Sequence, residues 1–222
     1  MEESTKPSVY LLIGNDLRAM RLFVKDFIDR MGDASMADLN TTRLDGNKLG
    51  DRDLAEAVGA LPFLTERRLV VLENPLAGIR GESAQKHLLG VLESIPPTTA
   101  LVMLMEDEIE RGAPKAYNEK HWFMRWAGTT KQRVFIKMLW LPAPKNMSEW
   151  IMKEAKKMGG TFSTSGAQAL TAEIGSNTEQ AQHEMEKLLA YVNYQRPVEA
   201  EDVLEVTAPG GEWSIFDMVD AM

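Results

Sequence analysis

Gly14 lies in a stretch, VYLLIGNDLRAMRL, with the layout of a nucleotide-binding element: an apolar strand, a glycine turn and the start of a helix. A phosphate loop also needs further glycines that turn backbone N–H groups inward, a Lys for the outer phosphates and a Ser or Thr for magnesium. The sequence instead continues with Asn15, Asp16 and Leu17. Because the carboxylate of Asp16 would repel a phosphate, we expect Gly14 to shape a turn and not to hold a nucleotide.

The other reactive residues form no recognisable catalytic or metal-binding pattern. His87, His121 and His183 are far apart in sequence and outside the H-x-x-x-H and H-E-x-x-H spacings. The chain has no cysteine and no G-x-S-x-G element, which removes the familiar acyl-transfer arrangements. Residues 106–108, Glu-Asp-Glu, follow an apolar run as the acid of a Walker B strand does, but no phosphate-loop lysine completes the site. We expect a solvated strand end there, and no catalytic residue, metal or cofactor.

The charge is unevenly distributed along the chain. Its net value is −8, yet residues 111–157 carry eleven Lys or Arg against three Glu, a local net of +8. Such a cluster either attracts an anionic partner such as nucleic acid or forms solvated helix faces. Trp122, Phe123 and Trp126 in the same segment either stack on unpaired bases or form one buried face of a helix. The candidate DNA-contacting residues are Lys120, Arg125, Lys131 and Arg133.

The composition is that of an ordinary globular protein. Of 222 residues, 44% are hydrophobic and 26% are charged, and no apolar run approaches the roughly 20 residues that span a bilayer. The first residues, MEESTKPS, do not resemble a signal peptide, and cysteine is absent. We therefore expect a cytoplasmic protein without membrane contact.

Apolar runs predict a parallel sheet. Residues 9–13, 68–73, 100–105 and 134–141 are almost continuously apolar, as in strands covered on both faces, and residues 42–44 are a weaker candidate. Helical periodicity lies between them, in residues 16–31, 51–61 and 83–95. The first part of the chain is therefore expected to be α/β, a parallel sheet flanked by helices.

The pattern changes after the PAPK sequence at 142–145. Asn146 with Glu149 suggests an N-cap for a helix that ends at residues 159–160, and Ser165 is expected to cap a second helix. Residues 177–192 form a third amphipathic segment. We expect a small three-helix domain.

The most specific stretch is ALPFLTERRLVVLENP. Pro62 interrupts the preceding helical pattern, and Phe63 and Leu64 then stand side by side ahead of charged residues and a strand. Adjacent residues cannot both face one core in a regular element, so at least one is expected to be exposed and to serve as a binding anchor. The alternative is that the pair covers the end of the core.

Together, the strand and glycine turn, LPFLTERRLVVLENP, AEIGSNTEQAQHEMEKLLAYV and the closing SIFDMVDAM resemble the delta subunit of the bacterial DNA polymerase III clamp loader. The resemblance implies three parts: an AAA+-like α/β domain at 1–143 without a functional phosphate loop, a three-helix lid-like domain at 144–208, and the start of a collar helix at 209–222. Because the sequence stops about where the family's collar begins, pentamer assembly is not expected of this chain.

The resemblance also implies a role. In the family, an apolar pair inserts into the ring-shaped DNA sliding clamp and helps to open it, which assigns this role to Phe63 and Leu64 with Leu61 as a helper. The implied partners are the sliding clamp, other clamp-loader subunits and primed DNA, within the DNA-directed DNA polymerase holoenzyme. No intrinsic ATPase is expected. The alternatives are a degenerate AAA+ ATPase and a nucleic-acid-binding module built on the basic segment.

Overall fold

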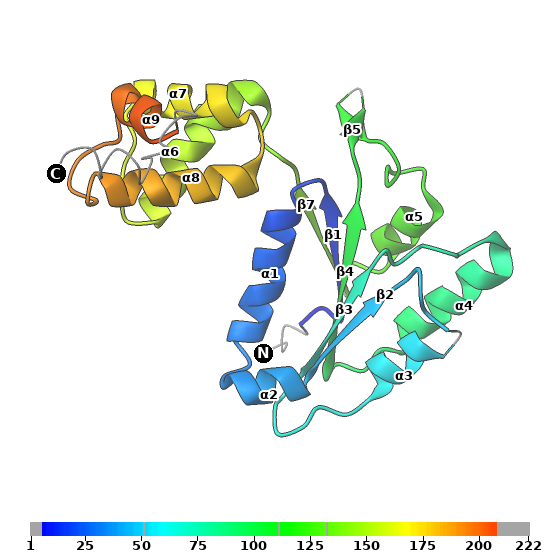
Figure 1. Cartoon of the computed structure of the whole chain (residues 1–222). Coiled ribbons are helices and arrows are strands. Elements are labelled where there is room, and N and C mark those ends of the chain that lie inside the picture. Colours follow the sequence, from blue (N-terminus) through cyan, green and yellow to red (C-terminus); the bar gives the residue numbers. More distant parts are fainter. Residues whose placement is uncertain (1–5, 51, 111, 132, 208–222) are drawn as a thin grey trace, which may run out of the picture. The chain divides into compact units, whose positions relative to one another are not determined.

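The computed structural model describes residues 6–50, 52–110, 112–131 and 133–207. The chain divides into two compact units, Met1–Trp140 and Leu141–Met222 (Figure 1). This division lies close to the boundary expected at residue 143. The collar helix expected at 209–222 lies outside the described residues.

The first unit is built on a five-stranded parallel sheet with the order β2-β3-β4-β1-β7. The central strands are buried along most of their length, which explains their nearly continuous apolar sequences. The strands are β1 (Val9–Gly14), β2 (Thr41–Asp45), β3 (Arg68–Glu73), β4 (Thr99–Glu106) and β7 (Val134–Leu139). The expected α/β class, a parallel sheet flanked by helices, is confirmed.

Helices cover both faces of this sheet (Figure 1). Helix α1 (Leu17–Asp29) packs Met20 and Val24 against one face, beside α2 (Ala34–Leu39). The other face packs against α3 (Asp53–Gly59), α4 (Gly81–Ser94) and α5 (Trp122–Thr129). A small hairpin, β5 (Ile109–Glu110) with β6 (Ala113–Pro114), follows the carboxyl end of β4. The sheet thus lies between two helical layers. The loops at its two ends are not covered by these layers and are where binding residues can lie.

The second unit is entirely helical apart from one isolated bridge between Phe162 and Val198, as far as the described residues show. A short 3-10 turn (Pro144–Asn146) precedes α6 (Met147–Lys157), α7 (Thr164–Ile174), α8 (Thr178–Tyr191) and α9 (Ala200–Thr207). The core is formed by apolar residues of all four helices. The sequence indicated three of these helices, and α9 is an addition to them.

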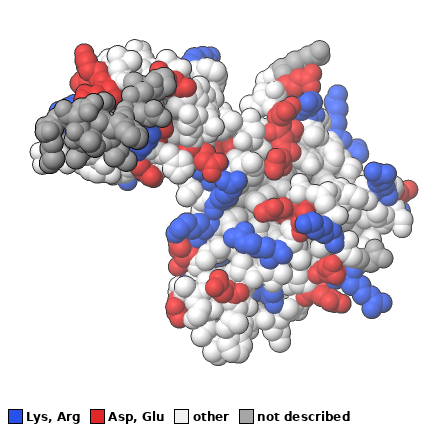
Figure 2. Space-filling view, viewed as in Figure 1, with Lys and Arg blue, Asp and Glu red and all other residues white. Residues whose placement is uncertain are grey.

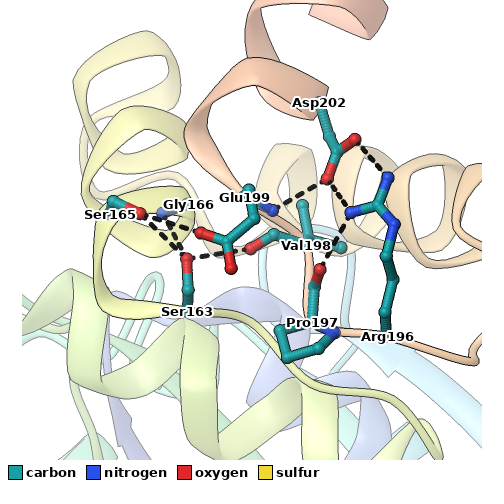
Figure 3. A network of polar contacts seen from close by, with 8 residues as sticks. All are labelled: Ser163, Ser165, Gly166, Arg196, Pro197, Val198, Glu199 and Asp202. Atoms are coloured by element: carbon teal, nitrogen blue, oxygen red, sulfur yellow. Dashed lines mark hydrogen bonds and ion pairs between the residues drawn. The ribbon is translucent and has the colours of Figure 1, made fainter.

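One expected helix cap is correct in position and the other is wrong: Asn146 is the N-cap residue of α6, with Glu149 in the first turn, whereas Ser165 does not cap α7. Asn146 makes no side-chain capping bond at the start of α6. At the start of α7 the cap is Ser163, whose Oγ accepts from the N–H of Gly166 at 3.0 Å, whereas Ser165 donates to Glu199 Oε2 at 3.1 Å (Figure 3). Both serines can cap a helix, and the one that does so is set by where the chain turns into the helix.

The N-termini of α7 and α9 are tied together by a polar network (Figure 3). The carbonyl of Val198 accepts from both the backbone N–H and the Oγ of Ser163, at 3.0 and 3.1 Å. Asp202 accepts two bonds from the guanidinium of Arg196, at 2.6 and 2.7 Å, and a third from the backbone N–H of Glu199 at 2.8 Å. These contacts fasten the segment between α8 and α9 to the start of α7.

Candidate functional site

Residues 60–67 connect α3 to β3 and expose three large apolar side chains. Leu61 is 83% exposed, Phe63 54% and Leu64 77%. This 60–67 loop begins directly after Gly59, the last residue of α3, so the apolar pair lies in a loop. An exposed cluster of this kind is unusual for a surface that meets only water.

The backbone of the 60–67 loop is fixed at Phe63 by a buried side chain. Oδ1 of Asn40 accepts from the N–H of Phe63 at 2.6 Å, and Nδ2 of Asn40 donates to the carbonyl of Phe63 at 2.8 Å. The same Nδ2 donates to the carbonyl of Met36, and Asn40 is only 1% exposed. Sequence reasoning missed Asn40, because no local pattern pairs it with a residue 23 positions away.

Further bonds hold both ends of the 60–67 loop. Thr99, which is fully buried, donates from Oγ1 to the carbonyl of Val58 at 2.9 Å, where α3 ends. Nη2 of Arg67 donates to the carbonyls of Pro7 and Thr99, both at 2.8 Å. The loop is therefore anchored before, within and after its apolar pair, and its exposed side chains project from a fixed backbone.

Leu64 adopts a left-handed backbone conformation with φ of +54°. For a residue with a branched side chain this conformation costs roughly 1–2 kcal/mol relative to the right-handed region. Strain of this kind persists where surrounding bonds fix the chain, and it occurs most often at functional sites. Here the bonds of Asn40 and Arg67 on either side provide that constraint.

The glycine turn after β1 is filled by the protein itself. The carboxylate of Asp16 accepts from the N–H of Ala19 at 2.9 Å and caps α1. The N–H of Asp16 donates to the carbonyl of Leu139 at 3.1 Å, and a Cβ on Gly14 would lie 1.8 Å from that same oxygen. The turn thus carries a carboxylate at the helix N-terminus, where a phosphate loop would receive a phosphate.

The acidic end of β4 is not uniformly solvated. Glu106 and Glu108 are exposed as expected, but Asp107 is buried, and the expectation is wrong for this residue. Its carboxylate accepts from the backbone N–H groups of Glu108, Ala116 and Tyr117, each within 2.9 Å. Asp107 therefore closes the loop that holds the β5–β6 hairpin.

This buried charge lies near two titratable rings. Burial raises the pKa of the Tyr117 phenol, and the charge of Asp107 adds to the effect. Burial lowers the pKa of the His121 imidazole, against the opposing influence of Asp107. Because Nδ1 of His121 accepts from the N–H of Phe123 at the start of α5, the neutral ring serves as a helix cap. His121 thus has a structural role.

The basic candidates lie in and around α5 and differ in their surroundings. Lys120, Arg125 and Lys131 are exposed. The guanidinium of Arg133 instead donates to the carbonyls of Glu93 and Ile95, at the end of α4. On the face seen in Figure 2, Lys and Arg side chains are interspersed with Asp and Glu. The structure therefore leaves three of the four candidates with side chains directed to solvent.

The aromatic residues of this segment belong to the core. Phe123 is fully buried, and Trp122 and Trp126 pack against the same cluster. Nε1 of Trp126 also donates to Glu93 at 3.2 Å. The buried-face interpretation holds in full for Phe123, for which base stacking is excluded, whereas Trp122 and Trp126 pack on the core and are only partly buried.

Two kinds of feature are absent from the residues that the structure describes. Within those ranges, no three His, Cys, Asp or Glu side chains are grouped so that they could ligate a metal ion. In the same part of the chain, no helix combines the length and apolarity needed to cross a membrane.

The chain is similar to proteins of known family. The family model described as DNA polymerase III, delta subunit, matches residues 10–122. DNA polymerase III subunit delta of Bacillus subtilis is 25% identical over 223 residues, which cover 96% of this chain and 60% of that protein. The chain therefore spans about three fifths of the length of this relative.

Solved structures give a similar result. The clamp loader delta protein of Bacillus subtilis matches with a TM-score of 0.68 at 20% identity, over 96% of this chain and 62% of that one. A RuvB structure from Thermotoga maritima matches with a TM-score of 0.48 at 14% identity, over 90% of this chain and 61% of that one. The first match confirms the expected fold, an AAA+-like sheet flanked by helices and followed by a small helical domain.

Proposed function

The chain belongs to the DNA polymerase III delta subunit family, and from this premise we propose that it binds the ring-shaped DNA sliding clamp and helps to open it for loading onto primed DNA. Leu61, Phe63 and Leu64 form the contact. The other clamp-loader subunits are its partners in this work, and the cytoplasm is its setting.

One observation supports this proposal above the others. Three exposed apolar side chains project from a loop whose backbone is held by hydrogen bonds before, within and after the apolar pair. An interface side chain that is already ordered loses less conformational entropy on binding, which leaves more of its burial energy for affinity. Asn40 and Arg67 fix the backbone that carries these side chains through their hydrogen bonds to the carbonyl and N–H of Phe63 and to the carbonyls of Pro7 and Thr99. The 60–67 loop thus combines the apolar area and the rigidity of a binding anchor.

Ring opening follows from binding if the 60–67 loop prefers the open ring. A ligand shifts an equilibrium between closed and open forms only by the difference between its affinities for the two. A rigid apolar tip favours the open form when the pocket that accepts it is distorted in the closed ring. The chain would then act as a wedge, and no chemical step is required of it.

The geometry at Gly14 supports a non-catalytic role. Asp16 already occupies the N-terminus of α1, and the carbonyl of Leu139 occupies the space beside Gly14. A nucleotide phosphate at this turn would have to displace both groups. We therefore assign clamp binding, and not ATP hydrolysis, to this chain.

A second candidate function is contact with DNA near α5. Lys120, Arg125 and Lys131 are exposed and form no ion pair among the residues that the structure describes. Exposed unpaired cations can each neutralise a phosphate, which makes binding depend steeply on salt. This contact would add to clamp binding, since primed DNA is the substrate onto which a clamp is loaded.

The clamp contact is tested by surface plasmon resonance against the sliding clamp encoded by the same genome. Burial of each side chain should contribute roughly 1.5–3 kcal/mol, so the double variant Phe63→Ser/Leu64→Ser should bind about 10²- to 10⁴-fold more weakly. The matched control is Leu22→Ser/Ile109→Ser, which changes two other exposed residues, 46% and 51% exposed, outside the loop. Circular dichroism checks the fold of each variant. If the first variant folds and keeps the parental affinity, the assignment is wrong.

A further inference from the structure

A groove opens beside the 60–67 loop, on the α1 side of the sheet. Its volume is about 670 Å³, and it lies at the amino ends of β1, β3, β4 and β7. Leu64 and Thr65 form one side, and the floor is aromatic. Of the three residues in the proposed contact, Leu64 lines this groove, whereas Leu61 and Phe63 do not.

The floor of the groove is a cluster of four aromatic rings. Tyr10 meets Phe27 edge-on at 4.8 Å between ring centroids, and Phe23 stacks on Phe135 at 6.2 Å. Tyr10 is almost completely buried, whereas Phe135 is 40% exposed. The floor therefore offers an open apolar surface that is already ordered by ring contacts.

The rim of the groove is charged, with an excess of positive groups. Arg30 pairs with Asp26 at 2.6 Å, and Lys6 approaches Glu66 at 4.0 Å. Arg67 and Arg68 also line the groove, and neither meets a carboxylate within the described part of the chain. Their Nε atoms are buried and have no hydrogen-bond partner among those residues.

We propose that this groove is the second half of the clamp interface and receives a large apolar side chain of the clamp, flanked by a clamp carboxylate. This inference rests on the proposed function. Its occupant follows from continuity, because Leu64 belongs both to the exposed tip and to the wall of the groove. A partner that covers Leu64 also covers the mouth of the groove.

The chemistry of the occupant follows from the lining. Aromatic rings with exposed apolar surface favour an apolar or aromatic side chain. The positive charge of Arg67 and Arg68, which no carboxylate of the described residues balances, favours an acidic neighbour. The clamp would then engage the chain in both directions: the tip enters the clamp, and a clamp side chain enters the groove. Two separated contacts fix the orientation of a partner better than one. A wedge needs a fixed orientation in order to act on one ring interface.

The first test uses two serine variants of the same strand. Phe135 lines the groove, whereas Met138 does not and is exposed to a similar extent, 43%. Phe135→Ser should weaken clamp binding about 10-fold, the range of one well-placed interface aromatic, and Met138→Ser should change it less than about 2-fold. Equal affinities of the Phe135→Ser variant and the parent would overturn the inference.

The second test leaves the chain unaltered, in case Phe135→Ser fails to fold. Hydroxyl-radical footprinting with and without the clamp reports the exposure of individual side chains. Oxidation of Phe135 and Met31, which both line the groove, should fall at least about 2-fold when clamp is bound, and oxidation of Met138 should stay the same. Unchanged oxidation of Phe135 in a clamp-saturated sample, or protection of Phe135 by a second copy of the chain without clamp, would overturn the inference.

The two proposals fail in different ways. If the parent binds the clamp, and Phe63→Ser/Leu64→Ser abolishes binding while Phe135→Ser does not, the groove inference is wrong and the proposed function stands. If the parent does not bind the clamp at all, both are wrong.

Discussion

The side-chain amide of Asn40 pairs with the backbone of Phe63 through both of its polar ends. Oδ1 accepts from the Phe63 N–H at 2.6 Å, and Nδ2 donates to the Phe63 carbonyl at 2.8 Å. The side-chain amide thereby gives Phe63 one donor and one acceptor, as a residue on a neighbouring β-strand would. The backbone of Phe63 is satisfied in this way, and its ring is left 54% exposed.

Asn40→Ala should therefore damage both stability and clamp binding. The change leaves the N–H and carbonyl of Phe63 without their partner, at a cost of about 1–3 kcal/mol in the free energy of unfolding. Urea denaturation measures this cost, and surface plasmon resonance measures clamp affinity. Asn118→Ala is the control, because Asn118 makes similar bonds to Lys115 and Lys120 away from the loop. Unchanged clamp affinity in a folded Asn40→Ala variant would show that the loop needs no fixed backbone.

Magnesium-ATP should not stabilise the chain. A ligand present at 100 times its dissociation constant raises the free energy of unfolding by about 2.7 kcal/mol, which differential scanning fluorimetry would detect as a higher Tm. We expect no such rise, because Asp16 and Leu139 occupy the turn. A Tm increase that disappears on replacing Asp16 would contradict this expectation.

The chain should bind an opened clamp more tightly than a closed ring. A clamp variant with a disrupted ring interface provides the open form, and a preference of at least about 10-fold corresponds to about 1.4 kcal/mol available for opening. Isothermal titration calorimetry on both clamp forms measures the difference. Equal affinities would leave clamp binding intact as a function but remove ring opening from it, since equal binding shifts no equilibrium.

Gly166→Ala should destabilise the second unit. A Cβ at this position would lie 2.2 Å from the carbonyl oxygen of Val198, within the network of Figure 3. Overpacking of this kind costs typically about 1–3 kcal/mol. The control is Gly90→Ala in α4, where no atom lies within 4 Å and the alanine should stabilise the helix by roughly 0.5–1 kcal/mol. Chemical denaturation followed by circular dichroism compares the two, and similar effects would contradict the packing argument.

The ion pair of Arg196 and Asp202 should make stability depend on pH in the acid range. The hydrogen bonds from Arg196 lower the pKa of Asp202 from 3.8 to about 2. In this case the unfolded chain binds the proton more readily, so the contribution is fully present above pH 3.8 and is lost as pH falls through about 2. Urea unfolding between these pH values should show that the free energy of unfolding falls more steeply with decreasing pH in the parent than in Asp202→Asn. Identical pH profiles would exclude the pair as the cause.

The sheet could be predicted because each of its main strands carries its signal locally. The apolar run at 68–73 predicts a strand, and β3 has those bounds. A strand buried on both faces must be apolar at nearly every position, which leaves little ambiguity. The adjacent apolar pair also predicts that at least one of Phe63 and Leu64 is exposed, because neighbours in a regular element cannot both face one core, and the structure exposes both.

The contacts that organise the site could not be predicted in the same way. Asn40 bonds to Phe63, and Arg133 bonds to carbonyls at the end of α4. The partners are far apart in sequence, so no pattern of residue spacing predicts either pair. Asp107 looked like a solvated acid, because a sequence does not reveal three backbone N–H groups converging on one carboxylate. Short elements such as α2 and the β5–β6 hairpin carry too few residues for a period to emerge.

The close approach of Leu139 to Gly14 gives a reason for a glycine at this position that is independent of phosphate binding. Any side chain here would collide with the carbonyl that receives the N–H of Asp16. The packing of the adjacent strand alone therefore requires a glycine here, with or without a bound phosphate. A strand followed by such a glycine does not by itself indicate a phosphate site, and that information lies in the residues after the glycine.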